Sequence, residues 1–379
     1  MTFDFLHDLG AFGIIPFLVV LTIVVFFHEL GHFLVARRCG VRVLTFSIGF
    51  GPELFGFYDR HGTRWKVSAI PLGGFVQFLG DENAASVPNQ PAIAAMSESE
   101  RTASLAHQKV LWRSAIVVAG PIANFILSIV IFAGIYMAAG RQLTPPRIDE
   151  VVPDSAAAMA GLQPGDLIVA IDDQPIANFT EMQRVVSTSS GRTLSLTVDR
   201  GGAKLDIKAT PTASSYCNAV LGIRNRGGDA RLQRENPVTA LGLGVDETYF
   251  IVDRSLCFVA GVILGRESAK QLGGPIGIAK AAGDAWNSGL DAGGLGTAIV
   301  WLLNLTALLS ASIGLLNLFP IPMLDGGHLL FYFIEAIRGR PLSERAQEVG
   351  FRIGLAIVLM LMIFATKNDL TGLWYRYMS

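Results

Sequence analysis

The chain has 379 residues, of which 51% are hydrophobic and only 16% are charged, and its mean hydropathy is +0.46. Soluble domains carry about a quarter charged residues, so this composition indicates a membrane protein. The formal net charge of −1 lacks the basic excess of nucleic-acid-binding proteins, and we expect no nucleic-acid partner.

Four apolar stretches approach the length of about 20 residues that a helix needs to cross a bilayer. They run from about 13 to 36, 115 to 139, 297 to 319 and 353 to 365, the last extended by its flanks. The residues before the first stretch are acidic rather than basic, so we expect no cleaved signal peptide. The sequence predicts a polytopic α-helical membrane protein with four transmembrane helices.

Between the first two stretches the pattern changes to short β-rich runs. Residues 43–51 and 65–70 alternate or are β-rich, and a Gly-rich run with Gly73 and Gly74 follows at 71–78. We expect a small sheet or hairpin against the membrane, with the Gly-rich run as a loop. Such a loop enters a bilayer only where protein or a water-filled cavity surrounds it.

The largest soluble block runs from about 142 to 296. Its first part reads as strand, short helix, turn and strand over 151–172, and as a hairpin over 193–209. Residues 237–265 are apolar with scattered charges, which predicts a helix along the membrane surface or leading into it. We therefore expect a compact β-rich domain followed by helices.

Lysine and arginine near the membrane helices predict their orientation. The segments 37–113 and 338–352 are rich in these residues, whereas the N-terminal tail has none. We expect both basic segments to face the cytoplasm, and both termini and the soluble block to face outward.

The three cysteines are odd in number and widely spaced. Cys39, Cys217 and Cys257 suggest neither a disulfide framework nor a cysteine zinc site. We expect isolated buried thiols.

The first apolar stretch contains an unusual polar cluster. His28 and His32 are four residues apart, so on a helix they project from one face and can bind one zinc ion. Glu29 between them can reach the attacking water as a general base. Ionisable residues inside a membrane helix are costly and indicate function. A solvated helix end at the interface is the alternative.

A catalytic zinc ion takes three protein ligands, so a third is expected elsewhere in the membrane. Asp325 is the candidate, because it follows Pro320 and Pro322, which break the helix after the third stretch. A capping role for Asp325 and direct ligation by His328 are the alternatives.

Five motifs together resemble the site-2 protease family of intramembrane zinc metalloproteases (M50), in its regulator-of-sigma-E protease branch. They are His28-Glu-Leu-Gly-His32, Pro71-Leu-Gly-Gly-Phe-Val, Gly120-Pro-Ile-Ala-Asn124-Phe, Leu272-Gly-Gly-Pro-Ile-Gly-Ile and Asn317-Leu-Phe-Pro-Ile-Pro-Met-Leu-Asp325-Gly-Gly. The five motifs occur in the family's order, and the resemblance covers nearly the whole chain.

The resemblance implies roles for named residues. His28, His32 and Asp325 would bind Zn²⁺, and Glu29 would be the catalytic base. Substrate backbone would be held by a second set, Asn124, Asn317, Gly73 and Gly74. A transmembrane substrate must be unwound before water can attack, because helical peptide bonds are shielded by their own hydrogen bonds.

The same resemblance implies a single PDZ domain inserted between the second and third helices, where some members of the branch carry two. The stretch Ala160 to Ile168 carries this likeness. The expected organisation is a first transmembrane helix (1–40), a cytoplasmic-side β element and loop (41–110), a second transmembrane helix (111–141), a periplasmic PDZ domain (142–215), a surface helical region (216–296), a third transmembrane helix (297–328), and a cytoplasmic loop with the fourth helix (329–379).

By resemblance, the partners would be the lipid bilayer and transmembrane substrates, such as anti-sigma factors already trimmed by another protease. The location would be the bacterial inner membrane, with the PDZ domain in the periplasm. Two other classes remain open, namely a membrane metal transporter and a non-catalytic PDZ receptor. The transporter would need a line of polar ligands across several helices, and the receptor would tolerate loss of Glu29.

Overall fold

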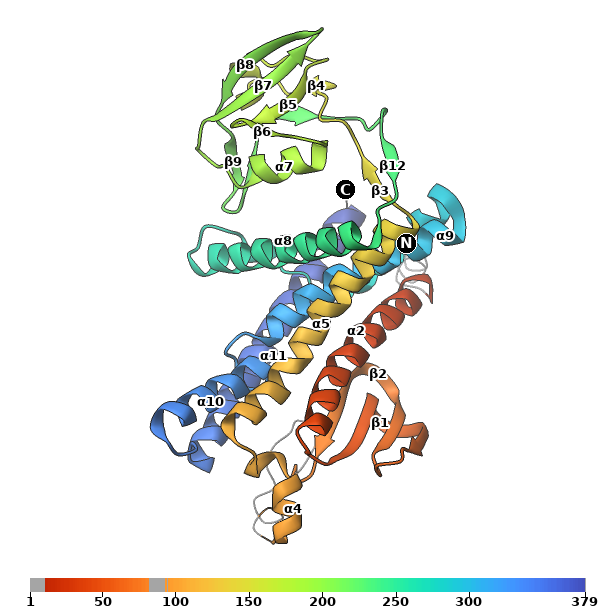
Figure 1. Cartoon of the computed structure of the whole chain (residues 1–379), viewed down its shortest axis with the longest axis vertical. Helices are drawn as coiled ribbons and strands as arrows, with labels where there is room; N and C mark the ends of the chain where they lie inside the picture. Colours follow the sequence, from red (N-terminus) through yellow and green to blue (C-terminus); the bar gives the residue numbers. More distant parts are fainter. Residues whose placement is uncertain (1–10, 82–92, 94, 379) are drawn as a thin grey trace. The chain divides into compact units, whose positions relative to one another are not determined.

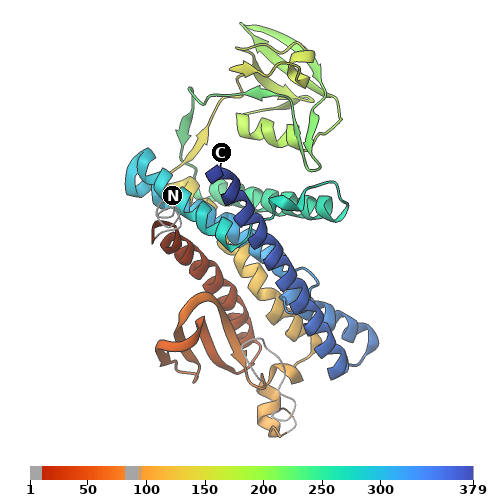
Figure 2. The same cartoon turned by 180° about the vertical axis from the view of Figure 1, so that it is seen from behind.

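The computed structural model describes residues 11–81, 93 and 95–378 (Figures 1 and 2). The expectation about a signal peptide falls on residues 1–10, outside that description. The chain forms two compact units. Unit 1 comprises Met1–Phe132, Leu243–Ile251 and Lys270–Ser379, and unit 2 comprises Ala133–Gly242 and Val252–Ala269.

Four long helices are apolar enough to cross a membrane, as the sequence predicts. They are α2 (Ala11–Arg38), α5 (Val110–Ala138), α9 (Pro275–Asn317) and α11 (Glu344–Met378) (Figure 1). The prediction of four helices that are long and apolar enough to span a membrane is therefore confirmed for the described residues. Two short helices, α4 (Glu98–Ala103) and η1 (Leu105–His107), precede α5.

Helix α9 consists of two helices that meet at a kink. Gly293 and Gly294 have non-helical backbone angles there, and the positive φ of 74° at Gly294 is one that glycine adopts without steric cost. The part after the kink corresponds to the predicted third stretch. Beyond α9, prolines prevent the helix from continuing. The chain resumes as α10 (Asp325–Arg338), and Glu335 of α10 pairs with Arg113 of α5.

The expected membrane-associated β element is a long hairpin of β1 (Val43–Tyr58) and β2 (Arg64–Phe78). The strands bend, so that Ser47 pairs with both Phe75 and Lys66. Phe46 is buried between Phe33 of α2 and Trp65, which fixes the hairpin against that helix.

The prediction of a Gly-rich loop at 71–78 was wrong, because these residues lie within β2. Gly74 pairs with Ile48, and a Cβ at Gly74 would lie 2.7 Å from the Ser47 carbonyl oxygen. The glycine permits the two strands to approach closely. Because glycine is also common in loops, its presence in the sequence suggested a loop here.

Unit 2 is built around a four-stranded sheet in the order β6-β5-β7-β8. Fully buried aliphatic side chains from Ile148, Ile168, Leu194 and Leu196 form its core. The predicted hairpin is confirmed, with Arg200 opposite Ala203 at its turn. The elements of unit 2 are β3 (Arg141–Leu143), β4 (Glu150–Val151), α6 (Ala156–Met159), β5 (Leu167–Ile171), β6 (Gln174–Pro175), α7 (Phe179–Ser187), β7 (Leu194–Arg200), β8 (Ala203–Ala209), β9 (Thr212–Ser215), β10 (Asn218–Val220), β11 (Ile223–Arg224) and β12 (Arg231–Gln233). Helix α8 (Pro237–Ile263) belongs to unit 2 at both ends and to unit 1 in its middle, and η2 (Ala269–Gln271) begins at the last residue of unit 2.

The expectation of isolated thiols was wrong for two of the three cysteines. Cys217, in the turn between β9 and β10, forms a disulfide with Cys257 of α8. The partners are 40 residues apart in sequence, and cysteine spacing alone does not reveal such a pairing. Cys39 is a free thiol.

Candidate metal centre

The two histidines lie on one face of α2, as their spacing predicts. Their Nε2 atoms are 3.2 Å apart, and the rings are nearly perpendicular. Both side chains are 12% exposed, so they are largely withdrawn from solvent. Two imidazoles held this closely in an apolar helix need a shared partner.

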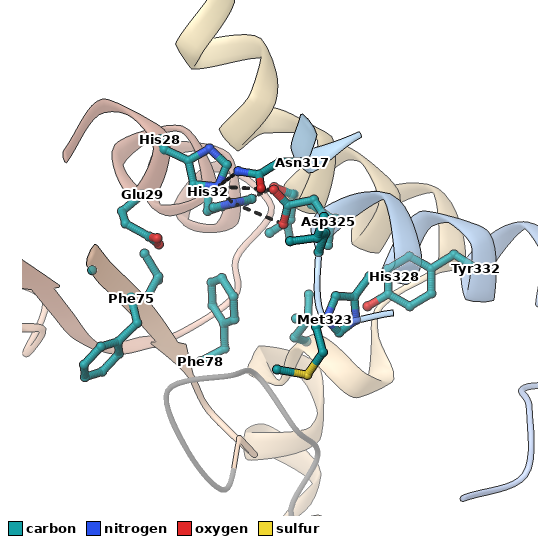
Figure 3. A pocket seen from close by; sticks show the side chains of 16 residues that line it. His28, Glu29, His32, Phe75, Phe78, Asn317, Met323, Asp325, His328 and Tyr332 are labelled. Carbon is teal, nitrogen blue, oxygen red and sulfur yellow. Dashed lines mark hydrogen bonds and ion pairs between the residues drawn. The ribbon is translucent and has the colours of Figure 1, made fainter. Parts of the chain in front are cut away.

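Asp325 brings a carboxylate to this pair from a distant part of the sequence. It is the first residue of α10, after the break that ends α9. One carboxylate oxygen lies 3.2 Å from Nε2 of His28, and the other lies 3.5 Å from Nε2 of His32 (Figure 3). The predicted convergence of the three side chains is therefore present.

The three separations fit a bound metal ion. All three ligand atoms lie within 4.8 Å of one another. A tetrahedral zinc ion with ligand bonds of about 2.0–2.1 Å holds neighbouring ligand atoms about 3.3 Å apart. The two Nε2 atoms are 3.2 Å apart, and they lie 3.2 and 3.5 Å from the two different oxygens of Asp325, which is close to this value. Two imidazoles and one carboxylate also form a ligand set found in catalytic zinc sites.

A second contact fixes how His32 presents its ring. Its Nδ1 lies 2.8 Å from the carbonyl oxygen of Ile116 in α5, so that Nδ1–H donates a hydrogen bond. This leaves the Nε2 lone pair free to face the histidine and the carboxylate, a common arrangement around ligating histidines. Helix α5 comes so close that a Cβ at Gly120 would lie 2.3 Å from His32 Nε2.

Glu29 borders a cavity of about 200 Å³ beside the three side chains. Its carboxylate lies on the side of α2 that is nearer to β2 (Figure 3). A Cβ at Gly74 would lie 3.2 Å from Glu29 Cγ, so the glycine lets β2 pass beside the carboxylate. The cavity offers space for a small part of another molecule next to both Glu29 and Asp325.

The two asparagines expected to hold substrate both contact His28. The Nδ2 atom of Asn124 lies 3.3 Å from His28 Nδ1, and that of Asn317 lies 3.3 Å from His28 Nε2. Asn317 borders the cavity, and Asn124 is fully buried. Of the two predicted glycines, Gly74 borders the cavity, and Gly73 lies against Phe50.

His328, the alternative third ligand, lies apart from the group that could hold a metal. Its ring packs on Phe351 of α11 at a centroid distance of 5.5 Å and on Tyr332 at 6.5 Å. It borders the cavity, with Tyr332 beside it (Figure 3). Among the described residues, Asp325 is the carboxylate that completes the histidine pair.

A sequence profile of peptidase family M50 matches residues 16–361, which include all three converging side chains. The chain belongs to this family. It is also 46% identical to a protein of Agrobacterium fabrum provisionally named a zinc metalloprotease, over 95% of this chain and 96% of that protein. It is 39% identical to the metalloprotease MmpA of Caulobacter vibrioides, over 94% and 95% of the two chains.

These comparisons confirm the predicted family and the predicted enzyme class, a metalloprotease. Four membrane-length helices fit a membrane member of family M50.

Sequence reasoning on this M50 chain missed the groups that contact the three candidate metal ligands. The carbonyl of Ile116 and the close approach at Gly120 both lie on α5. Gly120 belongs to a motif that carried the family resemblance, but the motif does not say what the glycine contacts. A backbone carbonyl has no sequence signal, so only the fold could identify Ile116.

Proposed function

We propose that the protein is an intramembrane zinc metalloprotease of the regulator-of-sigma-E protease branch. It would hydrolyse peptide bonds within or beside transmembrane segments of other proteins. Zn²⁺ would be held by His28, His32 and Asp325, and Glu29 would be the general base. The observation that carries this proposal is the convergence of two imidazoles and one carboxylate at 3.2–3.5 Å beside a cavity.

In this mechanism the chain orients the reactants and moves a proton. Zinc, when bound, would polarise the scissile carbonyl and acidify the attacking water. Glu29 takes the proton of that water and passes it to the leaving amine. The Ile116 carbonyl keeps the His32 ring oriented through Nδ1. No covalent enzyme intermediate is needed.

Substrate binding would use the groups around the cavity. Asn317 and Gly74 border it directly, whereas Asn124 and Gly73 lie just beyond. Strand β2 also borders the cavity through its segment 74–76. An unwound substrate segment could lie along these groups in extended form, with its peptide groups paired to protein rather than left bare in the bilayer.

We propose that residues 142–215 of unit 2 form a single PDZ domain. Support comes from the short helix α6, the turn before β5 and the four-stranded sheet. Such a domain could bind a peptide end or exclude bulky substrates by size. The substrates would be single-span proteins, such as anti-sigma factors trimmed by another protease.

The proposed location is the bacterial inner membrane, with unit 2 and both termini in the periplasm. The basic loops support this orientation through the positive-inside rule. The disulfide between Cys217 and Cys257 supports it independently, because disulfides persist in oxidising compartments such as the periplasm.

The test is Glu29→Gln in the full-length protein in detergent or liposomes. Zinc content and cleavage of a single-span test substrate are measured together. The proposal predicts that zinc is kept and that cleavage falls by roughly 10²–10⁴-fold. Glu348→Gln is the control, since Glu348 is an exposed residue of α11 paired with Arg352.

Three outcomes would contradict the proposal. Retained cleavage would remove Glu29 from the chemistry. Metal transport across liposomes that persists in Glu29→Gln would favour a transporter. A wild-type protein that binds partner proteins but cleaves none of them would favour a receptor.

A further inference from the structure

Gly354 of helix α11 lies directly against the loop that precedes Asp325. A Cβ on Gly354 would lie 1.6 Å from the carbonyl oxygen of Pro322 and 2.4 Å from its carbonyl carbon. Real side chains do not approach backbone this closely, so only glycine fits at this position. The obstacle is backbone rather than the end of a flexible side chain.

The touched carbonyl belongs to a strained peptide. The Pro322–Met323 peptide plane leads directly into Met323, whose φ is +98°. A positive φ is rare for a residue with a side chain and is kept only where surrounding structure enforces it. Turning this plane changes the φ of Met323, and Asp325 follows two residues later.

The rest of the loop has little room to absorb a displacement. The N–H of Ile321 donates to Phe319 O at 2.7 Å, and the N–H of Leu324 donates to Ile321 O at 2.9 Å. On the other side, a Cβ at Gly326 would lie 2.3 Å from the Leu318 carbonyl oxygen. A push on Pro322 would therefore be passed along the backbone toward Asp325.

The neighbouring contacts of α11 are softer. A Cβ at Gly350 would meet the ring tip of Phe331 at 2.8 Å, and that ring can move aside. Phe351 packs on His328 through ring contact. Gly354 is thus the residue of α11 that lies against the backbone of the loop.

We propose that Gly354 is a positioning residue for the metal centre. Its bare backbone lets α11 lie on the Pro322–Met323 peptide and hold it in the strained conformation that places the Asp325 carboxylate. None of the three proposed ligands lies on α11, and yet this helix sets the position of Asp325. This inference rests on the proposed function, because it takes Asp325 as a metal ligand.

The test compares Gly354→Ala with Gly372→Ala in the full-length protein. Both substitutions replace glycine by the better helix former in the same helix. A Cβ at Gly372 meets nothing within 4 Å, so that variant controls for propensity. The readouts are loss of zinc to a chelator and, after loading with Co²⁺, the visible absorption that reports ligand geometry.

Gly354→Ala should lower both zinc affinity and the rate of substrate cleavage by roughly 10–100-fold, the usual effect of disturbing groups that orient metal ligands. Its cobalt spectrum should change, while Gly372→Ala should match the wild type in every readout. Wild-type zinc retention and an unchanged cobalt spectrum in Gly354→Ala would overturn the inference.

Asp325→Ala is measured in parallel to separate the two claims. If it holds as much metal as the wild type, the proposed metal site fails, whatever Gly354→Ala does. If it loses metal and Gly354→Ala does not, only the positioning role fails.

A second substitution, Met323→Gly, tests whether the effect of Gly354→Ala acts through this peptide. Glycine at 323 lets the peptide plane turn without steric cost, so Gly354→Ala with Met323→Gly should recover part of the lost zinc retention relative to Gly354→Ala. A Gly354→Ala protein that does not fold, and that Met323→Gly does not repair, would also overturn the inference. It would show that the collision disturbs helix packing rather than this peptide.

Discussion

The two units of this chain are stabilised in different ways. Unit 2 encloses a core of fully buried aliphatic side chains such as Ile168 and Leu196, and a disulfide crosslinks it. In unit 1 the buried residues of membrane helix α9 are nearly all small, such as Ala307, Ser310 and Gly314. A Cβ at Gly31 of α2 would lie 2.3 Å from the Ala119 carbonyl oxygen of α5.

The difference follows from the two solvents. In water, burying large apolar side chains is the main driving force. In lipid that force is absent between helices, so close packing of small residues and internal polar contacts hold them together. Adding a methyl group should therefore be most harmful in unit 1, and removing a crosslink should be most harmful in unit 2.

The largest effect is expected at Asp325, the proposed metal ligand of unit 1. Asp325→Ala removes the carboxylate and leaves two buried imidazoles, so zinc should be lost and cleavage should fall to background. Metal content and substrate cleavage are measured on the purified protein. Asp284→Ala is the control, because Asp284 is exposed and pairs with Lys280 of the same helix. Zinc retained in Asp325→Ala would contradict the assignment.

The next effect concerns the crosslink of unit 2. Cys257→Ser should destabilise the β9–β10 hairpin by about 2–4 kcal/mol, the usual contribution of a disulfide. Hydrogen exchange at the amides of 212–220 in the full-length protein measures this loss of protection. Cys39→Ser is the matched control, since Cys39 is a free thiol. Rapid labelling of Cys217 by a maleimide in the untreated wild type would show that the crosslink is absent.

A smaller effect should follow from a single methyl group in unit 1. Gly120→Ala would drive a Cβ toward His32 Nε2, so metal affinity should fall by roughly 10–100-fold. Gly134→Ala in the same helix meets nothing within 4 Å and should keep wild-type affinity. Competition with a chelator measures both. Equal affinities would mean that helix packing in unit 1 tolerates bulk near the site.

The smallest effect is a pH dependence in unit 2. Hydrogen bonds from the Arg200 guanidinium, at 2.7 and 2.8 Å, and one from the Gln163 N–H lower the pKa of Asp166, although burial opposes its ionisation. A carboxyl with a lower pKa in the folded state stabilises the fold above its unfolded pKa of about 3.9. This stabilisation disappears as the pH falls toward the folded-state pKa.

Asp166→Asn should therefore lower the free energy of unfolding of unit 2 by on the order of 1 kcal/mol near neutral pH. The effect is small because Arg200 is partly solvated. The cost should shrink below a pH of about 4. Protection of the β7 amides at both pH values measures it, with the exposed Asp173→Asn as control. A cost that does not change with pH would exclude the ion pair as its source.

The sequence predicted the membrane-length helices and the histidine pair from patterns that are local in the chain. Long apolar runs define membrane helices by length alone, and the spacing of His28 and His32 places both on one helical face. Asp325 was reached through prolines that break a helix and through family resemblance. These signals are local in sequence or shared by relatives.

The parts that the sequence did not predict depend on contacts between distant backbone segments. The contact of Gly354 with Pro322 and the hydrogen bond to Ile116 O leave no pattern in a single chain. The pairing of Cys217 with Cys257 was missed because three cysteines do not specify a partner. The strand at Gly74 was missed because glycine marks both loops and close strand contacts.

The most direct test of the metal site is the X-ray absorption spectrum of zinc in the purified full-length protein. The proposal predicts one zinc ion per chain, with two imidazole nitrogens and carboxylate oxygen at about 2.0–2.2 Å. The imidazole signal should disappear with the metal in His32→Ala. A protein without zinc, or a spectrum dominated by sulfur ligands, would contradict it.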